Sequence, residues 1–259
     1  MIVQSLRGAI KHATLQLGAY RLARTLERIV SDRKRAAHAD AIELYRSLLP
    51  AGALCFDVGA NIGEVSEAML TAGARVVAFE PNPAVWPELL ARCAHHPGFA
   101  WIPAGAGSAS GLVTLFARDS HGQTSMRADW EGGDPHARDT TVPMVTLDAA
   151  IAKYGAPYYC KIDVEGWELE VLKGLTHRVP LISIESHTTD EYLADTHACL
   201  AHLARVGGAE INVAAGETRR MVFPEWMPLD QFLTDYPTTL RCGLSDAPYG
   251  DLFVRFTER

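Results

Sequence analysis

Residues 54–63 read Leu-Cys-Phe-Asp-Val-Gly-Ala-Asn-Ile-Gly, and this stretch decides the fold. Its first half is mostly apolar, as in a strand that is buried on both faces of a parallel sheet. The apolar run stops at a turn with glycines at positions 59 and 63, and a helical pattern of apolar residues begins after it at Val65. A strand, a glycine-rich turn and a helix in this order bring backbone N–H groups at a helix N-terminus toward a ligand. The stretch therefore predicts a ligand site at the edge of an α/β sheet.

An acidic residue stands at the end of each of two expected strands. Asp57 closes the first strand, and Glu80 follows the second strand, residues 75–79, at 17 positions after Gly63. A carboxylate about 20 residues past the last glycine hydrogen-bonds the ribose of a nucleoside ligand. Asp57 would repel a pyrophosphate, and Asn61 stands where the dinucleotide fingerprint has its second glycine. The two acids instead suit a ligand with an ammonium group and a ribose, such as S-adenosylmethionine. NAD is one alternative, and a bare turn whose acids only cap the next helix is another.

Three segments resemble the FkbM family of S-adenosylmethionine-dependent methyltransferases. They are residues 56–63, Phe79-Glu80-Pro81, and Lys161-Ile162-Asp163-Val164-Glu165-Gly166 followed by Glu168 and residues 171–174. The resemblance covers about residues 52–190, and the block from 161 to 166 is its most specific part. It implies S-adenosylmethionine as cofactor and O-methylation of a hydroxyl on a small molecule, such as a sugar or a polyketide-type natural product.

Strands that alternate with helices predict an α/β fold, here a Rossmann-like class I methyltransferase sheet with helices on both faces. Ligands bind at the carboxyl ends of such strands, where six polar residues are expected: Asp57, Glu80, Asp163, Glu165, Glu185 and His187. The family also places the adenine beside the loop that follows the third strand, where Ala106 leaves room for a flat ring. The predicted cofactor-binding residues are Asp57, Gly59, Asn61, Gly63, Glu80, Pro81, Ala106, Asp163 and Glu165.

Methyl transfer to a hydroxyl needs an oriented acceptor and benefits from a base. His187 is the expected base, because an imidazole titrates near neutral pH. Asp163 is the second candidate, either as base or as an orienting group. Lys161 is expected to pair with a neighbouring acid and hold the catalytic site rigid, since buried charges are costly unless paired. Glu185 is assigned to the substrate.

A metal-assisted mechanism is an alternative at the same strand ends. Asp163, Glu185 and His187 would offer oxygen and nitrogen ligands to Mg²⁺ or Mn²⁺. No tight ligand spacing supports such a site, so no metal ligands are predicted.

Residues 117–141 are polar and show little periodicity. A loop of this length in a compact domain is usually functional or disordered. We expect a lid or substrate-contact loop, with His121 and Ser125 at the substrate, and residues 122–126 resemble a serine-containing segment of the family. An exposed insertion without a function is the alternative.

The 259 residues suit one large α/β domain, or a domain with an extension. We expect an N-terminal helical extension over residues 1–50 and a methyltransferase domain over 51–259. Residues 2–31 have the apolar stripe of a long helix, and residues 1–35 carry a net charge of +6 against −13 for the remainder. Packing on its own domain or on a second subunit, as in a homodimer, is the simpler interpretation of this helix. Contact with an anionic membrane or an acidic partner is the other.

The acidic body argues against general nucleic-acid binding. No apolar run is long enough for a transmembrane helix and the N-terminus lacks the apolar core of a secretory signal, so a cytoplasmic location is expected. Five scattered cysteines without a C-x-x-C pair predict neither a disulfide framework nor a zinc site. Two rival functions remain open: an NAD-dependent oxidoreductase, and a non-catalytic binding protein on a methyltransferase fold.

Overall fold

The computed structural model describes residues 35–117, 124–127, 138–216, 220–244, 247 and 249–257. The chain divides into two compact units, residues 1–39 and 40–259, and most of the first unit lies outside the described residues. The long helix expected over 2–31 also lies outside them, so the extension over 1–50 and the homodimer remain predictions. Within the described part of the chain, no helix is both long enough and apolar enough to cross a membrane.

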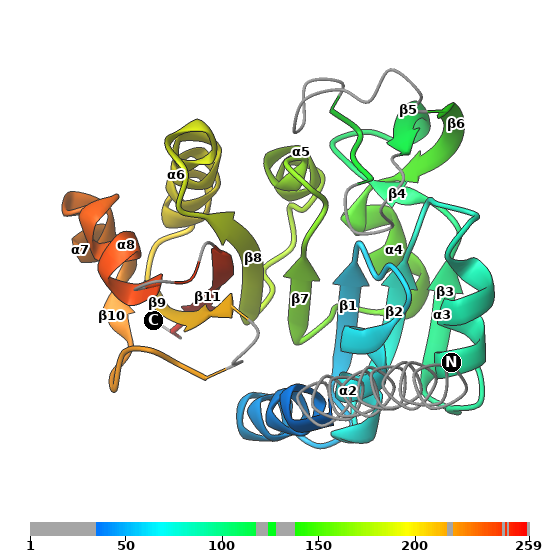
Figure 1. Cartoon of the computed structure of the whole chain (residues 1–259), viewed down its shortest axis with the longest axis horizontal. Coiled ribbons are helices and arrows are strands. Elements are labelled where there is room, and N and C mark those ends of the chain that lie inside the picture. The colour runs from blue at the N-terminus through cyan, green and yellow to red at the C-terminus, as the bar shows by residue number, and fades with distance from the viewer. Residues whose placement is uncertain are drawn as a thin grey trace, which may run out of the picture. The chain divides into compact units, whose positions relative to one another are not determined.

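An eight-stranded sheet forms the centre of the second unit (Figure 1). Its strands are, in order across the sheet, β3 (Phe99–Ile102), β2 (Arg75–Phe79), β1 (Leu54–Val58), β7 (Tyr159–Ile162), β8 (Leu181–His187), β11 (Tyr249–Phe256), β9 (Ala209–Ala215) and β10 (Met227–Pro228). The first five of these strands are parallel. The strand order reverses between β1 and β7, because the chain continues from β1 toward β3 on one side and from β7 toward β8 on the other. Ligands of doubly wound sheets bind at such a reversal.

Helices cover both faces of this sheet, as predicted. One face carries residues 40–48 of a helix, α2 (Glu64–Thr71) and α3 (Trp86–Cys93). The other carries α4 (Leu147–Tyr154), α5 (Glu168–Lys173), α6 (Asp190–Ala204), α7 (Leu229–Thr234) and α8 (Thr238–Leu244). Side chains alternate along β1. Phe56 and Val58 pack on the face that carries α4 to α8, and Cys55 packs on the face that carries α2 and α3. All five residues of β1 are buried, which explains why this strand is an apolar run without polar alternation.

Beyond β8 the sheet is no longer parallel. β11 is antiparallel to β8 and to β9, and β10 is antiparallel to β9. The segment between β9 and β11 contains the helices α7 and α8. Its prolines are compatible with helices, since Pro228 is the N-cap of α7 and Pro237 directly precedes α8.

A second, three-stranded sheet has the order β4 (Gly105–Ala106), β6 (Arg138–Val145) and β5 (Gly111–Ala117). β5 and β6 are antiparallel neighbours. The expected loop over 117–141 is therefore too long at its end, because β6 begins at residue 138. Between two stretches outside the described residues, 124–127 lies against β5, where Ser125 and Phe116 exchange backbone hydrogen bonds of 3.3 and 2.9 Å.

Candidate active site

The turn after β1 brings the ends of β1, β2 and β7 together. The N–H groups of Gly59 and Ala60 both donate to the carbonyl of Phe79 at the end of β2, at 3.1 and 3.0 Å. Gly59 has φ +84°, and a Cβ at this position would lie 1.8 Å from the carbonyl oxygen of Asp163. Only glycine fits this close approach of two backbones. Asn61 has φ +48°, a left-handed conformation that asparagine tolerates better than most residues.

Gly63 marks the start of α2. It is the N-cap residue with φ +85°, and a Cβ there would lie 2.7 Å from Leu89 Cδ1 on α3. Because Gly63 has no Cβ, Leu89 of α3 can pack closely against the start of α2.

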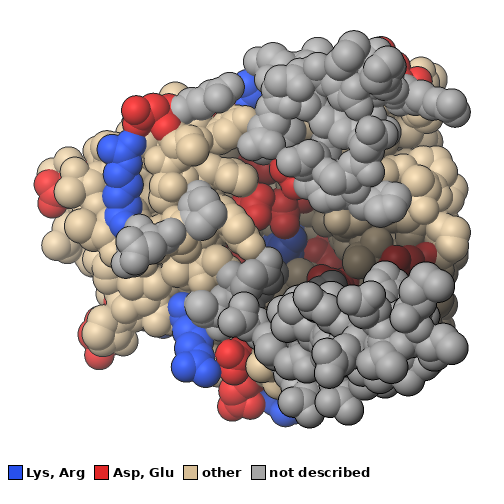
Figure 2. All heavy atoms as spheres, in the orientation of Figure 1, with Lys and Arg blue, Asp and Glu red and all other residues tan. Residues whose placement is uncertain are grey.

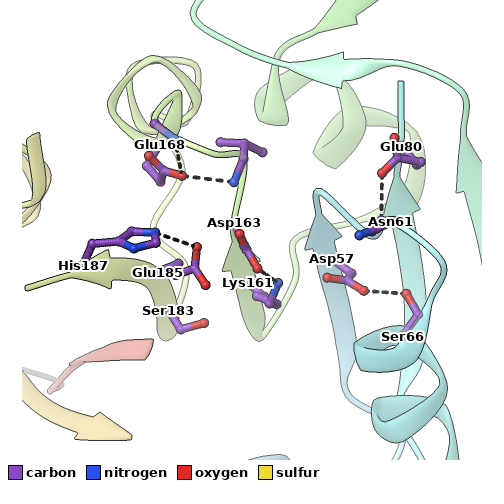
Figure 3. Close-up of polar contacts among 12 residues, drawn as sticks. Asp57, Asn61, Ser66, Glu80, Lys161, Asp163, Glu168, Ser183, Glu185 and His187 are labelled. Atoms are coloured by element: carbon purple, nitrogen blue, oxygen red, sulfur yellow. Dashed lines mark hydrogen bonds and ion pairs between the residues drawn. The ribbon is translucent and has the colours of Figure 1, made fainter. Parts of the chain in front are cut away.

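Glu80 connects the turn to the end of β2. One carboxylate oxygen accepts the N–H of Asn61 at 2.7 Å, and the other accepts the N–H of Asn82 at 2.7 Å (Figure 3 shows the former). Burial raises the pKa of Glu80 to about 7, against the lowering effect of the two N–H donors, and the charge of Asp57 raises it further. An ionised carboxylate has about four acceptor positions, so lone pairs remain for ligand hydroxyls after two N–H bonds.

A cavity with about 640 Å³ of empty space, part of it open to solvent, lies at these strand ends. Seven of the nine predicted cofactor residues line it: Gly59, Asn61, Glu80, Pro81, Ala106, Asp163 and Glu165. The structure also adds residues that the sequence did not single out, among them Asn82, Thr124 and Met126. Asn82 and Thr124 are connected by a hydrogen bond of 3.5 Å between their side chains. The cavity therefore unites the turn after β1 with the 124–127 segment.

Asp57 lies next to this cavity but does not line it. Its side chain is fully buried, and one oxygen accepts the hydroxyl of Ser66 on α2 at 2.6 Å. The acid is held beneath the turn, and its contact with a cofactor ammonium stays a prediction.

The buried Lys161 and the partly exposed Asp163 form an ion pair at the end of β7, with 2.7 Å between Nζ and Oδ2 (Figure 3). Burial opposes the charge of Lys161, but the carboxylates of Asp163, Asp57 and Asp251 raise the pKa of the ammonium above its ordinary value. The expected pairing of Lys161 is thus found. Asp251 is a site residue that the sequence analysis missed, because its place depends on the antiparallel pairing of β11 with β8.

The turn after β7 is held in an uncommon conformation. Glu165 has φ +54°, which is unfavourable for this residue type and is typical of functional sites. The buried carboxylate of Glu168 accepts the N–H groups of Val164 and Gly166 at 3.0 and 3.1 Å. From the opposite side, the hydroxyl of Ser125 donates to the carbonyl of Glu165 at 2.6 Å. Ser125 therefore supports the turn through the backbone, and its predicted contact with a substrate remains a prediction.

Glu185 and His187 lie together in a neighbouring cavity of about 320 Å³, which Asp195 of α6 also lines. The His187 Nε2 and Glu185 Oε2 atoms are 3.4 Å apart (Figure 3). Burial raises the pKa of Glu185 to about 7, and the charge of Asp163 adds to this shift while His187 opposes it. Ligand atoms of Glu165, Glu185 and His187 all lie within 4.8 Å of one another. The predicted base and the predicted substrate residue are thus in contact.

Arg127 connects the 124–127 segment to α6 through an ion pair with Asp195. Acidic side chains gather around a hollow on the face of the molecule shown in Figure 2. His121, the other residue predicted to contact the substrate, lies outside the described residues.

The reversal of strand order at β1 and β7, the glycine turn after β1 and the carboxylate after β2 define a class I methyltransferase fold with a nucleoside site. The family model described as "Methyltransferase FkbM domain" matches residues 57–207, which is more than half of the chain. The chain belongs to the FkbM methyltransferase family, and S-adenosylmethionine is its methyl donor.

Similar proteins include a hexuronic acid methyltransferase, AglP, from Haloferax volcanii. It is 29% identical over 170 residues, which cover 63% of this chain and 68% of the relative. Among solved structures, the precorrin-6y C5,15-methyltransferase of Geobacter metallireducens is 13% identical with a TM-score of 0.45, and covers 84% of this chain and 87% of that chain. Fibrillarin from Aeropyrum pernix with bound S-adenosyl-L-methionine is 10% identical with a TM-score of 0.43, over 79% of this chain and 66% of that chain.

The residues of the larger cavity fit S-adenosylmethionine. Glu80 retains acceptor capacity for the ribose hydroxyls, and the buried Oδ1 of Asn61 has no hydrogen-bond partner among the described residues. A buried acceptor in a cavity wall favours a ligand that brings a donor, because leaving it unsatisfied costs free energy. Asp163 and Glu165 line this cavity, and Gly166, which follows them in the chain, lines the neighbouring cavity.

Proposed function

We propose that this protein transfers the methyl group of S-adenosylmethionine to a hydroxyl oxygen of a small-molecule sugar. The observation that carries the proposal is the imidazole–carboxylate pair of His187 and Glu185, at the strand end next to the cofactor cavity. The bound cofactor supplies an electrophilic methyl group on a positively charged sulfur.

The acidic lining of the neighbouring cavity supports a hydroxyl acceptor. Glu185 and Asp195 line it, and Glu165 lies beside it. Carboxylates accept hydrogen bonds from hydroxyl groups and orient them. A sugar ring brings several hydroxyls, and the named substrate of the Haloferax volcanii relative is a hexuronic acid. A hexuronic acid also offers a carboxyl group. Methylation of a hydroxyl gives an ether, and methylation of the carboxyl group gives an ester.

The chain's own groups act on the acceptor in two ways. Carboxylates bind its hydroxyls and orient the acceptor oxygen in line with the methyl group. His187 takes the hydroxyl proton while the new bond forms, as a general base does. The Lys161–Asp163 ion pair keeps the end of β7 rigid between the two cavities.

The test is a transfer assay with S-adenosylmethionine labelled in its methyl group and a panel of neutral sugars and uronic acids. A methyl ether is stable to mild alkali, whereas a methyl ester is cleaved by it. We expect label that survives alkali, and label released by alkali would instead make the acceptor a carboxyl group.

A matched pair of variants tests the base. His187→Ala should lower turnover far more than affinity for S-adenosylhomocysteine, and the exposed His95→Ala should change neither. Full turnover of His187→Ala would remove this residue as the base.

A further inference from the structure

Glu185 and His187 are two positions apart on β8, so their side chains project from the same face of the strand. The side chain of His187 is 24% exposed and that of Glu185 is 18% exposed. The distance from His187 Nε2 to Glu185 Oε2 is 3.4 Å. At this distance the two side chains interact chiefly by charge, and a small movement would shorten the Nε2–Oε2 distance to that of a hydrogen bond. The aromatic rings of Tyr192 and Tyr249 lie 5.3 and 6.2 Å from the imidazole, which restricts where the ring can turn.

Several carboxylates lie near Glu185 among the described residues. Asp251 lies directly opposite it in the register of β11 and β8. After burial, the charge of Asp163 is the largest cause that raises the pKa of Glu185. A carboxylate oxygen of Glu165 lies within 4.8 Å of one of Glu185. Across the second cavity, Asp195 adds a further carboxylate.

Positive charge near the pair is limited among the described residues. Lys161 is bonded to Asp163, and Arg127 is bonded to Asp195. Buried carboxylates in such surroundings gain a proton readily or attract a cation. His187 is the group next to Glu185 that can carry that proton.

We propose that Glu185 is the positioning residue for His187, and that the neutral imidazole and the ionised carboxylate act as a unit that takes up and shares one proton when the acceptor hydroxyl is deprotonated. This inference rests on the proposed function and specifies how its base works. As the hydroxyl oxygen bonds to the methyl carbon, its O–H bond breaks and the proton moves to the pair. The carboxylate of Glu185 stabilises the imidazolium that results, because opposite charges at this range favour the charged form.

A divalent cation is the competing explanation for Glu165, Glu185 and His187. Two ligand atoms bound at right angles, each about 2.1 Å from one ion, lie only about 3 Å apart. The ligand atoms of all three residues lie within 4.8 Å of one another. The 3.4 Å contact of Glu185 with His187 involves no third residue, so we favour the shared proton.

The experiment is an NMR titration of the full chain, labelled in its histidine rings and saturated with S-adenosylhomocysteine. The His187 signals are assigned by their loss in His187→Gln. In the unmodified protein we expect these signals to shift in two steps across the neutral range, since coupled groups titrate as a pair. A single step would overturn the proposal without any variant.

Glu185→Gln provides the second arm. We expect its His187 signals to shift in a single step, displaced to lower pH by about one unit or more, which is a tenfold loss of proton affinity. The exposed Glu225→Gln changes the same charge elsewhere and should leave both steps in place. Unchanged titration in Glu185→Gln would refute the coupling.

Repeating the titration with Mn²⁺ distinguishes a bound divalent cation from a shared proton. Selective broadening of the His187 signals that disappears in Glu185→Gln would overturn the proposal in favour of a metal site. Binding of S-adenosylhomocysteine, measured on the same samples, reports on the cofactor site and on folding. A failure of the methyltransferase assignment is therefore visible separately from a failure of the shared proton.

Discussion

Cofactor affinity should depend on pH through Glu80. Both oxygens of this buried carboxylate accept backbone N–H groups, at 2.7 Å each, and we expect its remaining lone pairs to accept ligand hydroxyls most strongly when the group is ionised. Its pKa is raised to about 7, first by burial. A raised carboxylate pKa means that protons compete with the ligand below that pH, so affinity should fall as the pH falls through 7.

The size of this effect follows from the fraction of ionised Glu80. That fraction rises from about one tenth at one pH unit below the pKa to about nine tenths at one unit above it. The affinity for S-adenosylhomocysteine should therefore rise about tenfold between about pH 6 and pH 8, or about 1.4 kcal/mol. Calorimetric titration at three pH values measures it.

Two variants control for other titrating groups. Glu80→Gln removes the ionisable group and should bind weakly with no pH dependence, because an amide nitrogen would face one of the two N–H donors. Glu185→Gln removes the other carboxyl whose pKa is raised to about 7 and should keep the full dependence. A pH dependence that survives in Glu80→Gln would refute the reasoning.

Three further substitutions test the frame of the site by urea denaturation. Gly59→Ala should destabilise the fold by about 3 kcal/mol, because its Cβ would collide with the Asp163 carbonyl; wild-type stability would contradict the close approach. Lys161→Met should cost about 3–5 kcal/mol by leaving the charge of Asp163 without its buried partner, and a neutral or stabilising effect would show that the pair is dispensable. Ser125→Ala should cost about 1–2 kcal/mol through the lost bond to the Glu165 carbonyl, and no loss would mean that this hydroxyl does not support the turn.

The cavity residues at the ends of β1 and β2 could be predicted from sequence because their positions are determined locally. The turn after β1 is specified by glycine at 59 and asparagine at 61, both of which have positive φ. Glu80 follows directly on a strand that pairs with β1 in simple order. Spacing along the chain therefore placed these residues correctly.

The acceptor side depends on contacts between distant segments, which spacing does not reveal. Asp251 comes opposite Glu185 only because β11 inserts antiparallel between β8 and β9. Ser125 reaches Glu165 across 40 positions of sequence. Apolar runs such as β11 look alike whether they pair parallel or antiparallel, so the sequence could not choose their partners.

The most direct test of the central claim is calorimetric titration of the purified protein with S-adenosylmethionine, S-adenosylhomocysteine and NAD in parallel. We expect saturable binding of the first two and none of NAD, with binding weakened in Asp57→Ala by about 1–3 kcal/mol through loss of a charge-assisted hydrogen bond. Binding of NAD without binding of S-adenosylmethionine would contradict the assignment of the cavity to a methyl donor.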